Sequence, residues 1–166
     1  MEPSEELLER LWPDAYRIAY SVLRDHAAAE DAAQEACAAL LRSLHTLRDE
    51  RALRTWFYRV VVNESRTIAR CRHDELSPLD AQKLAVDPPG IDDLDLRHAI
   101  ERLPVTQRLP IIFHYHYGLR DQEIAGILGI SHAAVRVRLF QARRALKRAL
   151  QPPPVESERG VCHDAT

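Results

Sequence analysis

Helical periodicity is the feature of this sequence that most limits its fold. Apolar residues recur every three or four positions, as in Leu11, Ala15 and Ile18, and no stretch alternates as a half-buried strand would. Only 5 of the 166 residues are glycine, which argues against a turn-rich β architecture. The expected fold is therefore all-α. The spacing predicts helices over residues 5–24, 27–47, 50–72, 92–103, 104–117, 120–128 and 131–150.

Proline and acidic residues divide the chain into parts. An acidic stretch with Pro78, Pro88 and Pro89 has the composition of a linker. A run of three prolines after Gln151 ends the last predicted helix. We therefore expect two small helical domains and a disordered C-terminal tail. Their predicted bounds are 1–73 for the first domain, 74–91 for the linker, 92–150 for the second domain and 151–166 for the tail.

Several classes of protein are excluded by composition. No run of 18 apolar residues occurs, so we expect no membrane insertion. The acidic N-terminus lacks the apolar core of a signal peptide. The three cysteines, Cys37, Cys71 and Cys162, are far apart and odd in number, which is not the pattern of a disulfide framework. We therefore expect a cytoplasmic protein.

Basic charge is concentrated in two blocks, although the net charge is only −2. Residues 51–73 contain six arginines and one glutamate, and residues 131–150 contain six basic residues and no acidic one. Residues 1–50 and 74–96 are acidic. Such basic blocks favour a polyanionic partner. A solvated helix face is the competing interpretation.

Residues 121–150 have the spacing of a helix-turn-helix. Gly129 suits the left-handed position of the turn, and Ser131 suits the N-cap of the next helix. Phe140 lies on the polar side of that helix, where contact with a base in the major groove would explain it. A solvated or dimer-forming helix is the alternative. The predicted apolar side holds Val135, Leu139, Ala142, Leu146 and Ala149, and the opposite side holds Arg136, Val137, Phe140, Gln141, Arg144, Lys147 and Arg148.

The helix over 50–72 also has two predicted faces. Arginine mixed with one tryptophan and one asparagine suits unpaired DNA, because aromatic rings stack on bases and arginines bind phosphates. Half-buried packing of the tryptophan with solvated arginines is the competing interpretation. The apolar face holds Leu53, Phe57, Val60, Val61, Ile68 and Cys71, and the other holds Trp56, Arg59, Asn63, Arg66 and Arg70.

A third stripe lies on the helix over 27–47. It combines charged and polar residues with a small one, which suits either a docking face for another helix or a solvated side. Its members are Asp31, Gln34, Glu35, Ala38 and Arg42.

These blocks in this order resemble the sigma-70 family, and specifically the small extracytoplasmic-function (group IV) sigma factors. The resemblance covers about 7–73 and 92–150. It is carried by Asp31-Ala32-Ala33-Gln34-Glu35-Ala36, Thr55-Trp56-Phe57-Tyr58-Arg59-Val60-Val61-Val62-Asn63, Leu103-Pro104, Gln107-Arg108, and the helix-turn-helix from Gly118 to Arg143. In relatives a Gly-Asp pair is common where this chain has Asp49-Glu50, and an arginine is common where it has Gln141.

The resemblance implies a role for each block. Asp31, Gln34, Glu35 and Arg42 would dock on the β′ clamp helices of core RNA polymerase. The −10 promoter element would be read by Leu47, Arg48, Trp56, Arg59, Asn63, Arg66 and Arg70. The −35 element would be read by Ser131, His132, Arg136, Val137, Phe140, Gln141 and Arg144. The second domain would also meet the β flap.

The resemblance further implies promoter DNA as a ligand and an anti-sigma factor as a partner. It implies no enzymatic activity, no cofactor and no metal site.

Two other functions compete with this interpretation. A stand-alone helix-turn-helix transcription regulator would explain residues 119–150 but not the blocks at 31–35 and 55–63. A metal-dependent enzyme or zinc sensor is suggested by His114, His116 and Cys162-His163. His114 and His116 diverge by about 200° on a helix, which is poor geometry for ligands of one metal.

Overall fold

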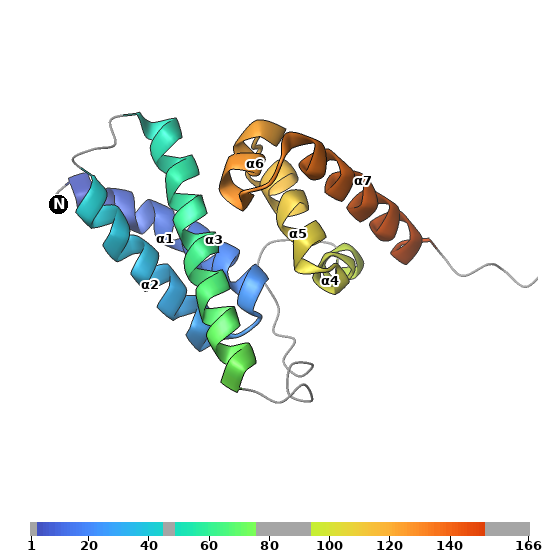
Figure 1. Ribbon diagram of the computed structural model, residues 1–166, viewed down its shortest axis with the longest axis horizontal. Helices are drawn as coiled ribbons and strands as arrows, with labels where there is room; N and C mark the ends of the chain where they lie inside the picture. Colours follow the sequence, from blue (N-terminus) through green and yellow to red (C-terminus); the bar gives the residue numbers. More distant parts are fainter. Residues whose placement is uncertain (1–2, 45–48, 76–93, 152–166) are drawn as a thin grey trace, which may run out of the picture.

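The computed structural model describes residues 3–44, 49–75 and 94–151, and regular structure in these ranges is helical throughout (Figure 1). The all-α expectation is confirmed. Leu47, Arg48, Cys162 and most of the expected linker and tail lie outside the described residues. Within the described part, no helix combines the length and the apolar character that crossing a membrane requires.

The first three helices pack against one another as a bundle (Figure 1). They are α1 (Pro3–Leu23), α2 (His26–Ser43) and α3 (Glu50–Glu75). The buried side of α2 is built from alanines such as Ala29, Ala32 and Ala33, whose small side chains let neighbouring helices approach closely. Asp25 caps α2, because its carboxylate accepts a hydrogen bond from the Ala28 backbone N–H at 2.8 Å.

The second half holds α4 (Leu94–Arg102), α5 (Val105–Ile111), α6 (Asp121–Leu128) and α7 (His132–Ala149). The helix predicted over 104–117 is α-helical only in its first half. It continues as a π-helical turn, η1 (Ile112–His116), in which the Tyr117 N–H reaches the Ile112 carbonyl at 3.2 Å. Gly129 ends α6 in the left-handed conformation with φ of 67°, as the turn prediction required.

The two halves share one continuous apolar core. Tyr58 of α3 is fully buried, and its ring lies 6.0 Å from that of Phe113 and 5.0 Å from that of Tyr117. Its hydroxyl donates to Asp14 of α1 at 2.5 Å and accepts from Arg54 at 2.7 Å. This contact brings α1 and α3 against the segment that contains η1.

One assignment on α3 is wrong. Cys71 was expected on the buried face and is exposed. The neighbouring Arg72 forms an ion pair with Asp25 at 3.3 Å, which places this part of α3 level with the turn between α1 and α2. The bundle ends there, so neither helix covers Cys71. Conversely, Tyr58 and Val62 are fully buried although the periodicity did not assign them to the core.

Candidate nucleic-acid interface

The outer face of α7 combines basic and apolar side chains. Val137 and Phe140 are 54% and 58% exposed, whereas Val135 and Leu139 are buried on the opposite side. The Arg144 guanidinium lies 5.8 Å from the centre of the Phe140 ring. Every predicted DNA-facing residue of this helix is exposed: Arg136, Val137, Phe140, Gln141, Arg144, Lys147 and Arg148.

The apolar side of α7 is shorter than the periodicity predicts. Ala142 is buried, but Leu146 is only partly buried and Ala149 is exposed. The apolar side of α7 is therefore covered as far as Leu146, and Ala149 beyond it is exposed.

The start of α7 is fixed by local polar contacts. The Ser131 hydroxyl accepts a hydrogen bond from the Ala134 backbone N–H at 3.1 Å, so Ser131 is the N-cap as predicted. The ring of His132 lies 3.6 Å from one Asp121 carboxylate oxygen, and that of His114 lies 3.7 Å from the other. Ser131 thus caps α7, and His132 lies beside Asp121, at the end of the helix predicted to meet DNA.

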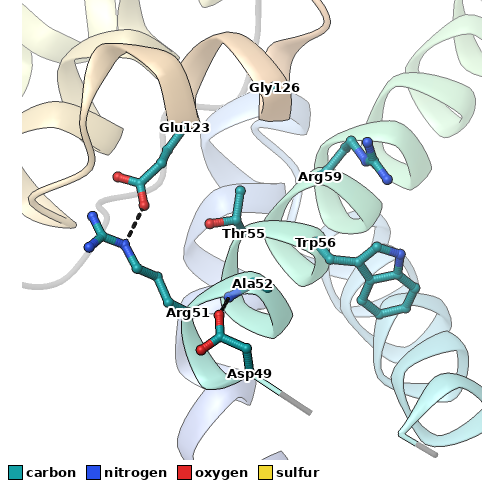
Figure 2. Close-up of a pocket in the computed structure, with 8 residues that line it drawn as sticks. All are labelled: Asp49, Arg51, Ala52, Thr55, Trp56, Arg59, Glu123 and Gly126. Carbon is teal, nitrogen blue, oxygen red and sulfur yellow. Dashed lines mark hydrogen bonds and ion pairs between the residues drawn. The ribbon is translucent and has the colours of Figure 1, made fainter. Parts of the chain in front are cut away.

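The first part of the α3 stripe borders a groove. Trp56 and Arg59 line an opening of about 440 Å³ between α3 and α6, together with Thr55, Glu123 and Gly126. Figure 2 shows Arg51 extending toward Glu123, while Trp56 and Arg59 point to the opposite side. Asn63, farther along the stripe, is exposed.

The second part of the stripe meets the helix-turn-helix. The Arg66 guanidinium donates to the Leu128 carbonyl at 3.1 Å and is partly buried, so it is not the solvent-facing group that the periodicity predicted. Arg66, Arg70 and Arg138 line a second groove of about 460 Å³. Burial, followed by the charges of Arg138 and Arg70, lowers the pKa of Arg66. Three mutually repelling arginines are suited to bind an anion.

Arg138 was missed by sequence reasoning as a member of this cluster. It lies on the side of α7 between the buried and outward faces, and its proximity to α3 follows only from how the two halves pack.

Glu123 links the two halves. One of its carboxylate oxygens accepts from Arg51 Nε at 2.7 Å, and the other accepts from the Arg120 backbone N–H at 2.8 Å. The bond from Arg51 is the main reason that the pKa of Glu123 is lowered. The same carboxylate therefore caps α6 and holds it against α3.

The polar stripe on α2 faces away from the bundle core. Asp31, Gln34, Glu35 and Arg42 are all exposed, whereas Ala32 and the other alanines of the opposite side are buried. Leu41 is 48% exposed and is a neighbour that sequence reasoning missed. The signal for it was its spacing of seven residues from Gln34, which places both on nearly the same side of a helix.

The histidines considered as metal ligands make other contacts. His116 accepts a hydrogen bond at Nε2 from Arg17 of α1 at 3.1 Å, and burial together with the Arg17 charge lowers its pKa. His114 faces Asp121. Among the described residues, no three His, Cys, Asp or Glu side chains gather as a metal site would require. Cys162 and His163 lie outside the described residues.

Comparison with protein families matches both halves of the chain. Residues 7–74 match the model for sigma-70 region 2, and residues 93–146 match the model for sigma-70 region 4. A stand-alone helix-turn-helix regulator would account for the second match alone.

Individual relatives agree with the family models. The chain is 28% identical to the RNA polymerase sigma factor SigV of Bacillus subtilis, with 81% of this chain and 82% of SigV aligned. It is 31% identical to the extracytoplasmic-function sigma-E factor of Escherichia coli, covering 74% of this chain and 73% of that protein. The fold matches RpoE in a complex with the anti-sigma factor NepR from Bartonella quintana, with a TM-score of 0.75, 22% identity, and 90% and 98% of the two chains covered. The chain therefore belongs to the sigma-70 family and is an extracytoplasmic-function RNA polymerase sigma factor, a protein that directs transcription initiation from specific promoters.

Proposed function

We propose that this sigma factor uses three separate helix faces to direct initiation. The outer face of α7 reads the −35 element in duplex DNA, the basic stripe of α3 captures unpaired bases of the −10 element, and the polar stripe of α2 docks on the β′ clamp helices. The second half also meets the β flap. In this scheme the protein supplies specificity and core RNA polymerase supplies the catalysis.

The observation that carries the −35 assignment is the exposed apolar pair on α7. Val137 and Phe140 stand in solvent among arginines, where core packing gives no reason for them. A helix in the major groove can place such side chains against thymine methyl groups while arginines contact guanine edges and phosphates. His132, Gln141 and Arg144 would extend the contact along the groove.

Capture of the −10 element is assigned to α3. Trp56 is suited to stack on a base, and Arg59, Arg66 and Arg70 are suited to bind phosphates. By resemblance to the family, Asn63 lines the pocket for a flipped base, which Leu47 and Arg48 complete. Each stacked base contributes roughly 1–3 kcal/mol, which offsets the cost of unpairing it.

The second half covers part of the α3 stripe. Arg66 is bonded to Leu128 in this arrangement, and Trp56 and Arg59 border a groove against α6. We infer that binding to core polymerase moves the second half away and exposes the stripe. Weak promoter binding by the protein alone is expected, because the acidic segments also repel DNA. A gel shift at physiological salt that shows tight binding without polymerase would contradict this.

A promoter library transcribed with purified core polymerase tests the proposal. Adding the protein should create start sites that share −35 and −10 sequences, and Asn63→Ala or Arg136→Ala should remove them. If both variants initiate like the wild type, the assigned readout is wrong. If the protein neither binds core polymerase nor initiates but does bind duplex DNA, the stand-alone regulator is the better description.

The α2 docking face is tested by a charge reversal with a matched control. Glu35→Arg places a positive charge within the stripe and should weaken core binding by about tenfold, as removal of a central charged contact does. Glu9→Arg makes the same change at an exposed position of α1, outside the stripe, and should bind core normally. Equal affinities of the two variants in a pull-down titration would exclude this face.

An anti-sigma factor is the remaining expected partner. The RpoE structure contains NepR, and a second similar fold, CnrH, was solved with the cytosolic domain of CnrY. Such a partner would compete with polymerase in the cytoplasm for this chain.

A further inference from the structure

A partly open cavity lies between the two halves, away from the two grooves along α3. It has a volume of about 270 Å³, with α1 on one side and α4, α5 and η1 on the other. None of its lining residues lines either groove along α3. It is therefore a separate feature that the proposed promoter contacts do not use.

Apolar side chains form most of the cavity wall. Leu96 and Ile100 come from α4, Ile111 and Ile112 from the junction of α5 and η1, and Tyr20 from α1. The volume is slightly below the roughly 300–1,000 Å³ of typical small-molecule sites. A small apolar body would fit such a wall.

The polar part of the lining is predominantly basic. Arg17 and Arg24 enter from α1 and the turn after it, and Arg97 and Arg108 enter from the second half. Glu101 is the one carboxylate among the lining residues, and it pairs with Arg24 at 3.2 Å and with Arg97 at 4.0 Å. Glu101 therefore serves two of these guanidinium groups, and Arg17 pairs instead with Asp14 of α1 at 3.7 Å. The wall itself contains more guanidinium groups than carboxylates.

Arg108 is the most deeply buried arginine of the lining. It is only 8% exposed, and one of its terminal nitrogens donates to the Glu101 backbone carbonyl at 2.9 Å. Its Nε has no acceptor within the part of the chain that the structure describes. Burial lowers the pKa of Arg108 to about 10, with a further contribution from the charge of Arg24 and an opposing one from Glu101. The side chain thus stays charged at neutral pH, and a buried charge without a full set of acceptors is costly.

We propose that this cavity binds a small carboxylate with an apolar body. The carboxylate would accept hydrogen bonds from Arg108, and the apolar part would lie between Ile100 and Ile112. Because the walls come from both halves, the ligand would favour the arrangement in which they are packed together. The proposal depends on this arrangement and not on promoter recognition, so either can fail without the other.

Isothermal titration calorimetry on the full-length chain with octanoate tests the site. Octanoate should bind once per chain, whereas octanamide, which lacks the charge, and acetate, which lacks the apolar body, should bind much more weakly. Arg108→Met should weaken octanoate binding by about tenfold or more, because it removes a charge-assisted hydrogen bond. Replacement of a buried charge by an apolar side chain of similar size is often tolerated by the fold.

Two further variants keep the test decisive. Arg102→Met makes the same change at an exposed position of α4 outside the cavity, and should alter the affinity by no more than about twofold. Ile100→Phe keeps every charge but fills the cavity, and should also abolish octanoate binding. This variant tests the site even if Arg108→Met does not fold. Absence of saturable octanoate binding would overturn the proposal, as would equal affinities for octanamide and acetate or an unchanged affinity in Arg108→Met and Ile100→Phe.

Discussion

Gly129 shows how a single residue fixes the geometry of the helix-turn-helix. It ends α6 at φ of 67°, a conformation that L-amino acids with a side chain adopt at a cost. The turn that follows sets the direction in which α7 leaves. Gly126, by contrast, lies inside α6 with an ordinary helical backbone. Of these two glycines, only Gly129 needs a positive φ.

This contrast gives the first prediction. Gly129→Ala should destabilise the protein by about 1–2 kcal/mol through backbone strain, because no neighbouring atom crowds the added carbon. Gly126→Ala should instead stabilise it by about 0.5–1 kcal/mol, since alanine is the better helix former and space is also open there. Urea unfolding of both variants measures the difference. Equal effects would show that φ at position 129 does not control stability.

Residue-level periodicity predicted which side chains of α7 are exposed, but not the contacts between the halves. Spacing alone placed Val137 and Phe140 outside and Val135 inside, because α7 meets the other helices along one side. Tyr58 belongs to a second buried side of α3, whose partners, Asp14 and Tyr117, lie 44 and 59 positions away. A repeat of three and four residues carries no information about contacts at such separations, so this cluster could not be predicted.

At the scale of elements, α7 has a buried side that contributes to stability and an exposed side that we propose for recognition. Leu139 is buried and Phe140, the next residue, is exposed. Phe140→Ala should leave the free energy of unfolding within about 0.5 kcal/mol of the wild type and reduce binding of holoenzyme to −35 DNA by about tenfold or more. Leu139→Ala should cost about 2–5 kcal/mol of stability.

Two measurements on both variants test this assignment. One is thermal unfolding, and the other is promoter binding by the reconstituted holoenzyme. If Phe140→Ala binds promoters like the wild type, the exposed ring does not read DNA. If it unfolds as readily as Leu139→Ala, the ring is part of the core after all.

The sequence pattern of α3 predicts only part of which side chains are buried. The periodicity identified the buried Leu53, Phe57 and Val61 correctly but extended the same face to Cys71, which lies where the bundle ends. It also left Arg66 in solvent, although α6 covers part of it. A helix pattern gives the direction of each side chain, whereas its burial depends on how far the neighbouring helices reach.

At the scale of the whole molecule, an ion pair helps to keep the two halves together. Arg51 bonds Glu123 across the boundary at 2.7 Å, and Arg10 bonds Glu50 within the first bundle at the same distance. Arg51→Glu should therefore loosen the packed arrangement, and Arg10→Glu should not. The ratio of closed to open molecules should fall by about fivefold or more, because the exposed pair is weak but its loss is joined by repulsion between the new carboxylate and Glu123.

Small-angle scattering checks this directly. The radius of gyration should rise in Arg51→Glu and stay unchanged in Arg10→Glu, and the first variant should bind unpaired −10 DNA more tightly than the wild type despite its lost positive charge. A larger radius in Arg10→Glu as well would mean that the charge change loosens the first bundle and not the boundary.

The contact between the two halves should also weaken at low pH, and the pKa of Glu123 gives the direction of this change. Its pKa lies below the ordinary value of 4.5 because the ionised carboxylate accepts bonds from Arg51 and the Arg120 N–H. A lowered pKa means that the contribution of Glu123 is complete above its ordinary pKa and is lost as the pH falls through the lowered one. The radius of gyration should therefore increase as the pH falls below about 4.5.

In Glu123→Gln this increase at low pH should be much smaller, since the amide does not titrate. Asp25→Asn is the control, because it also removes a carboxylate of lowered pKa but one that caps α2 within the first bundle. If Glu123→Gln opens at the same pH as the wild type, other carboxylates govern the separation of the two halves.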